Sequence, residues 1–234
     1  MYRLLQFIRQ IAAERPRGAH WSHLRYFPRR QRSLREGCSS VSERLPWISF
    51  PAIDRLKRDV KPTDRVFEYG GGGSTLFWAD RVAEVVTVEH DAAWFERLQA
   101  LMAGTSGAKW TGRFVPATPG DLVPAPDPAD PAHYASGDEA SKGHNYKAYV
   151  EVIDAYPDGY FDIVLIDGRG RTSCIAHSIP KLKRGGLLVL DNAERTYYTE
   201  HNSAALAQLE PVLTGMAPVA FSLDLSETRI YRRK

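Results

Sequence analysis

The residues of this chain that are best suited to chemistry cluster in a short glycine-rich segment. It runs Glu68-Tyr69-Gly70-Gly71-Gly72-Gly73-Ser74-Thr75 and follows a β-prone apolar run. Glycine lets the backbone turn sharply and approach a ligand closely, because no Cβ stands in the way. Amide groups at the start of a following helix are free to donate hydrogen bonds. The segment therefore predicts a turn that cradles a ligand, with a carboxylate just ahead of it.

A second carboxylate, Glu89, lies 19 residues after Gly70, at the end of the next apolar run. In nucleotide-binding α/β folds, an acid at about this distance accepts hydrogen bonds from ribose hydroxyl groups. The turn and the spaced acid together predict a ligand with an adenosine-like ribose. A nicotinamide dinucleotide and an adenosyl sulfonium both satisfy these two features.

Three details favour the sulfonium. Thr75 stands where the G-x-G-x-x-G dinucleotide fingerprint has its third small residue. The Glu68 carboxylate would repel a pyrophosphate, but it suits a ligand that carries a sulfonium and an amino group. Asp167 and Asp191, which each end an apolar run, add to the expected negative charge.

Asp167, Asp191 and Asn192 form a second candidate site. Two carboxylates and an amide oxygen are ligands suited to Mg²⁺, which could hold the vicinal hydroxyl groups of an acceptor. Alternatively, an arginine takes the place of the ion and pairs with either aspartate. Without a metal, Asp167 or Asp191 is a candidate general base, and Arg169 or Arg171 could hold an anionic acceptor.

The elements that must position these groups alternate between strands and helices. Strands are expected at residues 65–69, 85–89, 114–115, 161–166 and 187–190, with a closing pair at 219–223 and 228–231. Helices are expected at 1–14, 76–80, 92–102 with Asp91 as N-cap, and 173–183. This alternation is typical of a parallel sheet covered on both faces, whose ligands bind at the carboxyl ends of the strands. We therefore expect Glu68, Glu89, Asp167 and Asp191 to line one crevice.

Two segments depart from this alternation. Residues 1–46 are expected to form a basic extension, irregular from 15 to 46, and its first 36 residues hold nine arginines and only two acids. The favoured interpretation of this extension is a helix packed on the domain, although basic arms also bind nucleic acid or anionic lipid. Residues 116–145 are a proline-rich insertion, interpreted as a lid or an acceptor-binding segment. Residues 47–234 are expected to form the α/β domain.

The overall composition is that of an ordinary globular protein, with 43% hydrophobic and 25% charged residues. No run reaches the roughly 20 apolar residues of a membrane span, and no secretory signal is visible. Cys38 and Cys174 lie far apart, which favours a reducing compartment and argues against a zinc site. A cytoplasmic protein is expected.

Three stretches of the chain resemble the motifs of class I S-adenosylmethionine-dependent methyltransferases. Residues 64–91 are similar to motifs I and II, residues 162–169 to motif IV, and residues 184–192 to the strand-five motif. The resemblance covers roughly residues 47–232. It implies a Rossmann-like, doubly wound sheet of seven strands in which the last strand runs antiparallel.

The resemblance also implies a cofactor site. Glu68 and the Gly70–Gly72 backbone would face the methionine end of S-adenosylmethionine, and Glu89 would hold its ribose. His90 would lie against the adenine, and residues 47–50 would cover the methionine side. The full set expected to contact the cofactor comprises Glu68, Tyr69, Gly70, Gly71, Gly72, Ser74, Thr75, Glu89, His90 and Asp167.

The predicted activity is methylation of a hydroxyl group on a small molecule or glycan, with Asp167 or Asp191 as base or metal ligand. The pattern of Asp167, Asp191 and Asn192 is similar to that of metal-dependent O-methyltransferases of the catechol and macrolide-sugar types, although Gly170 stands where the catechol type has a lysine. Expected acceptor contacts are Arg169, Arg171, Tyr146 and Tyr197.

Three alternatives stay open. The first is an RNA methyltransferase that uses the arginine-rich extension, and the second is an NAD(P)-dependent oxidoreductase. The third is a non-catalytic module that binds nucleic acid or a membrane surface through the extension. Motif IV lacks the Asn/Asp-Pro-Pro-Tyr/Phe pattern and the Pro-Cys pair expected of DNA methyltransferases. A homo-oligomer is compatible with all of these readings.

Overall fold

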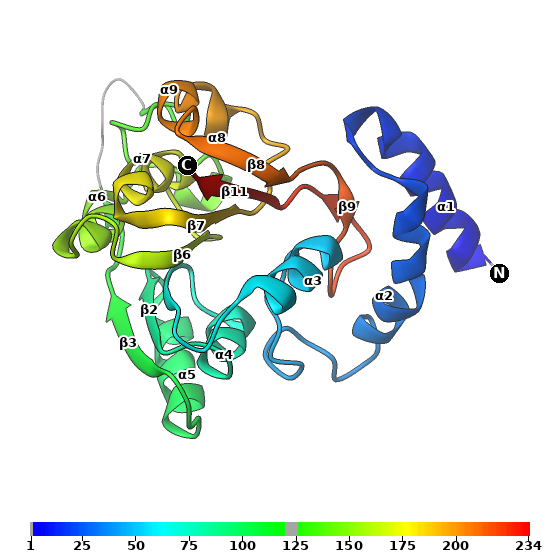
Figure 1. The fold of residues 1–234 in the computed structure, drawn as a ribbon, viewed down its shortest axis with the longest axis horizontal. Coiled ribbons are helices and arrows are strands. Elements are labelled where there is room, and N and C mark those ends of the chain that lie inside the picture. The colour runs from blue at the N-terminus through cyan, green and yellow to red at the C-terminus, as the bar shows by residue number, and fades with distance from the viewer. Residues whose placement is uncertain (1, 120–125) are drawn as a thin grey trace.

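A seven-stranded sheet runs through the centre of the computed structural model, which describes residues 2–119 and 126–234 (Figure 1). Its strands lie in the order β3-β2-β1-β6-β7-β11-β8. Their bounds are β1 (Arg65–Tyr69), β2 (Glu84–Glu89), β3 (Lys109–Phe114), β6 (Phe161–Ile166), β7 (Leu182–Leu190), β8 (Leu209–Leu213) and β11 (Arg229–Arg233). The last strand, β11, runs antiparallel to both of its neighbours, β7 and β8, while the other recorded pairings in this sheet are parallel. The predicted Rossmann-like sheet of seven strands with an antiparallel last strand is confirmed.

Helices cover both faces of this sheet. The helices of the described residues are α1 (Tyr2–Glu14), α2 (Phe27–Ser33), α3 (Phe50–Asp59), α4 (Gly73–Ala79), α5 (Ala92–Ala103), α6 (Lys147–Val150), α7 (Arg171–Lys181), α8 (Tyr197–Glu200) and α9 (Ser203–Leu206), of which α1 and α2 lie beside the sheet and not on its faces. One apolar cluster joins the sheet to α3 and α4, and a second joins its other face to α6, α7 and α8. This two-sided burial explains why the strands read as nearly continuous apolar runs. Asp91 caps α5 as predicted, accepting a hydrogen bond from the Trp94 amide.

The predicted closing strand pair is half right. Residues 228–231 fall largely within β11, but the partner of β11 is β8 at Leu209–Leu213 and not residues 219–223. Val219 makes only an isolated bridge to Ser49, and Phe221 has a positive φ of 59° that a regular strand cannot contain. An apolar run of this length cannot distinguish a strand from a buried loop.

The N-terminal extension is helical over much of its length, which corrects the irregular structure expected for residues 15–46. Besides α1 and α2 it holds two 3-10 helices, η1 (Arg15–Arg17) and η2 (Trp21–Tyr26). Phe7 and Ile11 of α1 are buried in a cluster with Ala19 and Met216, beside the short strands β9 (Ala217–Pro218) and β10 (Leu225–Ser226). Figure 1 shows α1 and α2 lying side by side next to β9. The extension is therefore packed against the C-terminal part of the chain.

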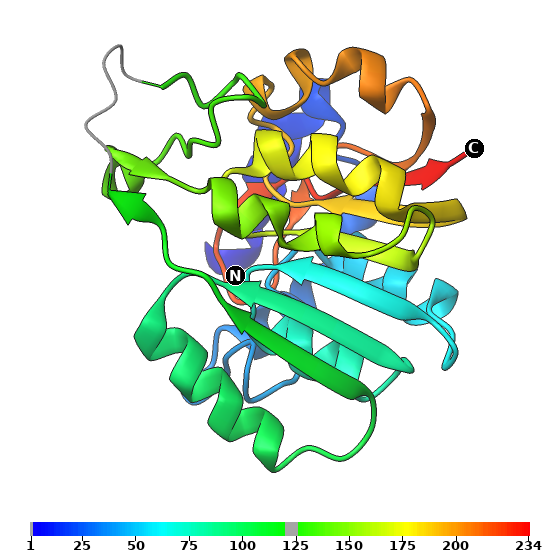
Figure 2. The same ribbon diagram turned by 90° about the vertical axis from the view of Figure 1, so that its left-hand side faces the viewer.

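The described part of the proline-rich insertion contains few regular elements. Two-residue strands β4 (Thr118–Pro119) and β5 (His144–Asn145) pair near its ends, and the 3-10 helix η3 (Glu139–Ser141) lies between them. A further 3-10 helix, η4 (Glu151–Ala155), comes after the insertion, directly behind α6. Residues 120–125 of this predicted insertion lie outside the described residues. Figure 2 shows the insertion at the side of the molecule toward which the arrows of β2 and β3 point. Among residues 2–119 and 126–234, no helix is both long and apolar enough to cross a membrane.

Candidate functional site

The carboxyl ends of β1, β2 and β6 border a cleft of about 320 Å³. Its lining residues come from the glycine turn, from the ends of β2 and β6, and from the region that follows α2. They are Ser40, Trp47, Gly70, Gly71, Gly72, Gly73, Ser74, Glu89, His90, Trp94, Asp167, Gly168 and Arg169. This is the edge at which parallel sheets bind their ligands. Of the four acids expected in one crevice, Glu89 and Asp167 line this cleft.

The glycine turn needs glycine for two different reasons. Gly70 has a φ of 86°, and a Cβ on it would stand 3.0 Å from the Gly168 Cα, so neither the conformation nor the space admits a side chain. Gly72 is extended, and a Cβ on it would meet only the Trp94 ring at 3.7 Å. Gly72 therefore presents bare backbone to the cleft.

Glu89 is held in the cleft wall by backbone amides. One carboxylate oxygen accepts from the Gly71 amide at 3.1 Å, and the other accepts from the amides of His90 at 2.7 Å and Asp91 at 2.9 Å. Burial favours a higher pKa for Glu89, but the hydrogen bonds from His90, Asp91 and Gly71 outweigh burial and lower the pKa. Glu89 therefore stays ionised at neutral pH and can accept hydrogen bonds from ligand hydroxyl groups.

Glu68 lies below the turn and not in the cleft. It is fully buried, and its Oε1 accepts hydrogen bonds from the hydroxyl groups of Thr75 and Thr87, the latter at 2.8 Å. Oε2 has no hydrogen-bond partner among the described residues. Burial raises the pKa of Glu68 to about 7. In this arrangement Glu68 ties the turn to β2. Its side chain does not face the cleft, which corrects the prediction that it faces a cofactor.

The other residues predicted around the turn divide between the cleft and the core. Gly71 and Ser74 line the cleft, whereas Thr75 is buried against Glu68. The Tyr69 side chain points into the opposite face of the sheet, where its hydroxyl donates to the Val150 carbonyl at 2.7 Å. Only the backbone of Tyr69 lies near the turn, so side-chain contact with a ligand is not expected.

His90 and Trp94 complete the wall beside Glu89. The His90 Nδ1 lies 2.9 Å from Glu89 Oε1, and its ring stands edge-on to Tyr146 and Tyr149. The Trp94 indole donates to the Gly71 carbonyl at 2.7 Å and so braces the turn from α5. Trp94 was not among the site residues predicted from the sequence. Its place in the first turn of a helix capped by Asp91, next to Glu89, was a signal that it lies near the site.

Asp167, Asp191 and Asn192 do come together, and the Arg171 guanidinium stands among them. Arg171 Nη2 lies 3.0 Å from Asp167 Oδ1, while Nη1 donates to the Asn192 Oδ1 at 3.1 Å and to the Asp191 carbonyl at 2.5 Å. Asp191 Oδ2 is 4.0 Å from Nη1, and its other oxygen accepts from the Thr228 hydroxyl at 2.7 Å. The arginine thus neutralises one of the two carboxylates.

The remaining negative charge is removed by a proton. Burial and the neighbouring Asp167 carboxylate raise the pKa of Asp191 to about 8, and burial also raises the pKa of Asp167. Two acids this close titrate as a pair, so at neutral pH the pair holds one proton and one negative charge, which Arg171 balances. Asp167 borders the cleft, whereas Asp191 is buried behind it.

The predicted magnesium site does not fit this donor set. The Arg171 guanidinium already occupies the space between the three groups, where it bonds to the Asn192 amide oxygen and the Asp167 carboxylate and lies 4.0 Å from Asp191 Oδ2. Over residues 2–119 and 126–234, no group of three or more His, Cys, Asp or Glu side chains is arranged to hold a metal. The alternative in which an arginine takes the ion's place describes the structure.

The residues predicted to hold an acceptor are dispersed. Arg171 is paired with Asp167, and its side chain is only 10% exposed. It is therefore not free to bind an acceptor, which corrects the role expected for it. Arg169 lines the cleft but is paired with Asp138 of the insertion at 2.9 Å. Tyr146 is buried and its hydroxyl donates to Ser141, and the Tyr197 ring packs at a tilt against its neighbour Tyr198. Neither tyrosine lines the cleft.

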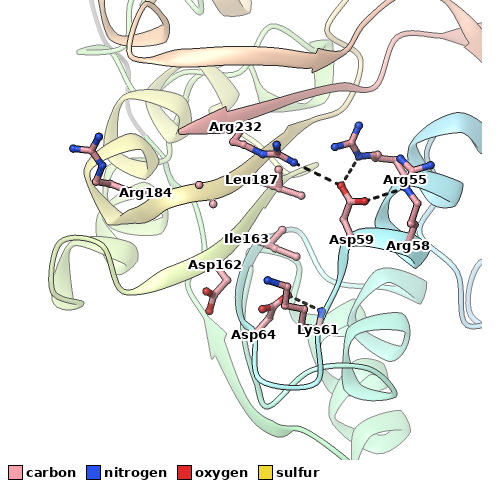
Figure 3. A pocket seen from close by; sticks show the side chains of 12 residues that line it. Arg55, Arg58, Asp59, Lys61, Asp64, Asp162, Ile163, Arg184, Leu187 and Arg232 are labelled. Carbon is pink, nitrogen blue, oxygen red and sulfur yellow. Dashed lines mark hydrogen bonds and ion pairs between the residues drawn. The ribbon is translucent and has the colours of Figure 1, made fainter. Parts of the chain in front are cut away.

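A larger depression of about 680 Å³ lies at the amino ends of the strands, near the start of β1 and β6. Figure 3 shows Arg55, Arg58 and Arg232 arranged around Asp59 there, and Lys61 beside Asp64. Its acids are already used in such pairs, and the glycine turn lies at the other end of the sheet. The smaller cleft is therefore the candidate site.

Comparison with known proteins gives similarity at the level of the fold. No protein-family description and no curated protein sequence matches the chain. Among solved structures, a methyltransferase-like protein from Silicibacter pomeroyi is 21% identical over 76% of this chain and 83% of its own, with a TM-score of 0.44. TrmN from Thermus thermophilus is 12% identical over 79% of this chain and 48% of its own, with a TM-score of 0.47. TYW2 from P. horikoshii, solved with MeSAdo, is 12% identical over 76% of this chain and 60% of its own, with a TM-score of 0.45.

The chain is a Rossmann-like α/β protein whose cleft, at the carboxyl ends of β1, β2 and β6, combines a bare glycine turn with an ionised acid on the next strand. A charge-balanced aspartate pair lies at one end of that cleft.

Proposed function

We propose that the chain is a class I S-adenosylmethionine-dependent methyltransferase that methylates a hydroxyl group on a small molecule or glycan. The observation that carries the proposal is the composition of the cleft. Ionised Glu89, the open backbone of Gly72 and the Asp167 side chain all line it. This arrangement suits a ligand with a ribose and a positively charged centre.

The electrostatics of the cleft disfavour a dinucleotide. Among the described residues that line it, the single lysine or arginine is Arg169, which is paired with Asp138, while Glu89 and Asp167 add negative charge. A pyrophosphate on the glycine turn would meet these carboxylates without a free cation to offset them. The oxidoreductase alternative is therefore the weaker one.

The residues of the cleft fit S-adenosylmethionine in the following roles. Glu89 would accept hydrogen bonds from the ribose hydroxyl groups, and the His90 ring would lie beside the adenine. The backbone at Gly70 and Gly72, with Asp167, would surround the methionine end. Glu68 would act indirectly, because it holds the turn in shape from below.

When bound, the cofactor supplies a methyl group carried on a reactive sulfonium. The protein then has to place an acceptor oxygen in line with that methyl group and remove the proton of the hydroxyl. We assign the second task to Asp167, which is the member of the aspartate pair that reaches the cleft. The bound cofactor would supply the methyl group to the acceptor oxygen, and Asp167 would accept the proton that the hydroxyl gives up.

Asp191 and Arg171 would set the charge state of Asp167. With the proton of the pair on Asp191 and the guanidinium beside Asp167, the exposed carboxylate is the one that is free to accept a proton. No metal ion enters this scheme, because Arg171 fills the place that an ion would need.

The alternative acceptor is a nucleic acid, which the arginine-rich extension would bind. Several of these arginines are engaged within the protein: Arg30 is buried, Arg29 pairs with Asp54, and Arg17 pairs with Glu14. An extension used in this way has fewer charges left for phosphate groups, which favours the small-molecule or glycan acceptor.

Calorimetric titration with S-adenosylmethionine tests the proposal. Gly72→Leu would place a side chain in the cleft without backbone strain, and we expect it to weaken binding at least about tenfold, a loss of about 1.4 kcal/mol. Gly104→Leu is the matched control, because Gly104 lies on the exposed end of α5, where a Cβ meets only Leu101 at 3.8 Å.

The wild-type chain and Gly104→Leu should bind alike. Absence of heat with the wild-type chain at high micromolar cofactor would defeat the proposal. Tight binding of NADH that Gly72→Leu abolishes would favour the oxidoreductase instead.

A further inference from the structure

A second cleft adjoins the candidate cofactor cleft. It has a volume of about 320 Å³ and shares Trp47 and Asp167 with the first cleft. Its lining residues are Trp47, Asp167, Asp191, Asn192, Val219, Ser222, Asp224 and Ser226. A molecule in the second cleft would therefore touch Asp167, which also lines the first cleft.

The lining of this second cleft has a distinct chemistry. It combines an exposed aromatic ring, Trp47 at 54% exposure, with short hydroxyl, amide and carboxyl side chains. No lysine or arginine lines it among the described residues. Asp224 is exposed, and the buried Arg30 guanidinium offsets its charge only through longer-range attraction. A phosphate-bearing ligand would therefore meet the carboxylates of Asp224 and Asp167 with no cation among the described lining residues.

The polar groups of this cleft are held in fixed positions. The Asn192 amide donates to the Ser226 hydroxyl at 2.9 Å, and that hydroxyl donates to Glu194 at 2.9 Å. The Ser222 hydroxyl donates to Asp224 at 2.8 Å. Fixed donors and acceptors beside an aromatic face are suited to a ligand that has many hydroxyl groups and an apolar ring face.

The N-terminal extension holds the wall that carries these groups. Arg30, only 2% exposed, donates to the Ser222 carbonyl at 3.2 Å and also to the Leu223 carbonyl. Gln10 donates to the Leu223 carbonyl at 2.9 Å, and the Phe221 amide donates to the Ser33 hydroxyl at 3.1 Å. A buried guanidinium on two adjacent carbonyl groups fixes the loop that forms this wall.

Resting on the proposed function, we infer that the second cleft binds the methyl acceptor and that the acceptor is a neutral polyhydroxylated molecule, such as a sugar ring packed on Trp47. One of its hydroxyl groups then points across Asp167 into the cofactor cleft. The hydroxyl oxygen gains the methyl carbon, the carbon–sulfur bond breaks, and Asp167 takes the hydroxyl proton.

The experiment offers three acceptor classes to the full-length chain with methyl-labelled S-adenosylmethionine. The probes are an array of mono- to tetrasaccharides with free hydroxyl groups, a mixed transfer-RNA fraction and a set of primary amines. We expect label in the saccharide arm. Label confined to the RNA or amine arm, or no label on any saccharide, overturns the inference.

Charge reversal at the second cleft sharpens the test. Asp224→Lys should lower the rate of label transfer to the saccharide at least about tenfold, because it removes an acceptor of hydrogen bonds and adds an ammonium group. Asp158→Lys is the matched control, since Asp158 is exposed at the amino end of the sheet. Equal rates for the two variants would contradict the placement of the acceptor.

The same samples separate the two proposals. Calorimetry should give the same affinity for S-adenosylmethionine in the wild-type chain and in Asp224→Lys, because Asp224 does not line the first cleft. Cofactor binding without saccharide labelling defeats this inference alone, whereas loss of cofactor binding in the wild-type chain defeats the proposed function itself.

Discussion

At the scale of single residues, Arg171 decides the chemistry of the site. It reaches the Asp167 carboxylate, the Asn192 amide oxygen and backbone carbonyl groups of the same region from a position that is almost fully buried. A buried carboxylate pair without a cation would be costly, so the arginine makes both the protonated Asp191 and the ionised Asp167 tolerable.

We predict that Arg171→Met destabilises the chain by about 3–5 kcal/mol at neutral pH, because it leaves a buried charge unpaired. Urea unfolding followed by tryptophan fluorescence measures the change. Adding Asp191→Asn to this variant should recover part of the loss, since only one ionisable acid then remains. Loss of less than about 1 kcal/mol in the single variant would show that the guanidinium is not the balancing charge.

Because Arg171 occupies the place of an ion, we predict that Mg²⁺ does not bind specifically to the folded chain. A ligand that binds only the folded state raises the melting temperature, so millimolar Mg²⁺ should leave that temperature unchanged relative to a matched NaCl control. A specific rise with Mg²⁺, abolished by Asp191→Asn, would restore the metal site that the sequence indicated.

At the scale of elements, the extension behaves as part of the domain. Phe7 and Ile11 lie on the buried side of α1, whereas Leu4 and Leu5 are exposed. The arginines of the same segment are divided in the same way, because Arg30 is buried against the loop at residues 222–223 and others face solvent. The sequence pattern changes at the proposed boundary between residues 46 and 47, but side chains on the two sides of this boundary pack against each other.

We predict that Phe7→Ala lowers the free energy of local unfolding of α1 by about 3 kcal/mol, the usual cost of removing a buried aromatic ring. Leu5→Ala, on the exposed side, should change it by less than about 0.5 kcal/mol. Hydrogen exchange of residues 2–14, read by mass spectrometry, compares the two variants. Equally fast exchange in both would mean that the extension is a free arm.

At the scale of the whole molecule, two buried acids make stability depend on pH. The pKa of Glu68 is raised from 4.5 to about 7, and that of Asp191 is raised from 3.8 to about 8. Between these ordinary and raised values the unfolded chain has released protons that the folded chain still binds. Linkage then requires the free energy of unfolding, as far as these two groups set it, to fall as pH rises from about 4 to about 8.

We predict that Glu68→Gln flattens this fall between pH 4.5 and about 7, because the variant has no proton to release at that position. Urea unfolding at a series of pH values measures the slope for both chains. The Thr87 hydroxyl bond is retained by the amide oxygen, so the native packing should persist. An unchanged slope would mean that Glu68 is already ionised in the folded protein.

Local sequence patterns were enough to predict several strands of the sheet, the glycine turn and Glu89 after it. Apolar runs that end at Glu89 and at Ile166, a helix capped by Asp91 and a run of glycines between a strand and a helix are local features, and local patterns report them directly. The antiparallel last strand and the seven-stranded sheet followed from the motif resemblance. The role of the proline-rich insertion and the contacts with a cofactor stay predictions.

The direction of each charged side chain, and the group of opposite charge that it meets, became clear from the three-dimensional structure alone. Side chains alternate across a strand, so Glu68 and Tyr69 of one strand end on opposite faces, and neither lines the cleft. Arg171 reaches Asn192, 21 residues away in sequence, and Arg30 reaches the loop at Leu223 across 193 residues. Charge compensation depends on distance through space, which the spacing of residues along a chain does not fix.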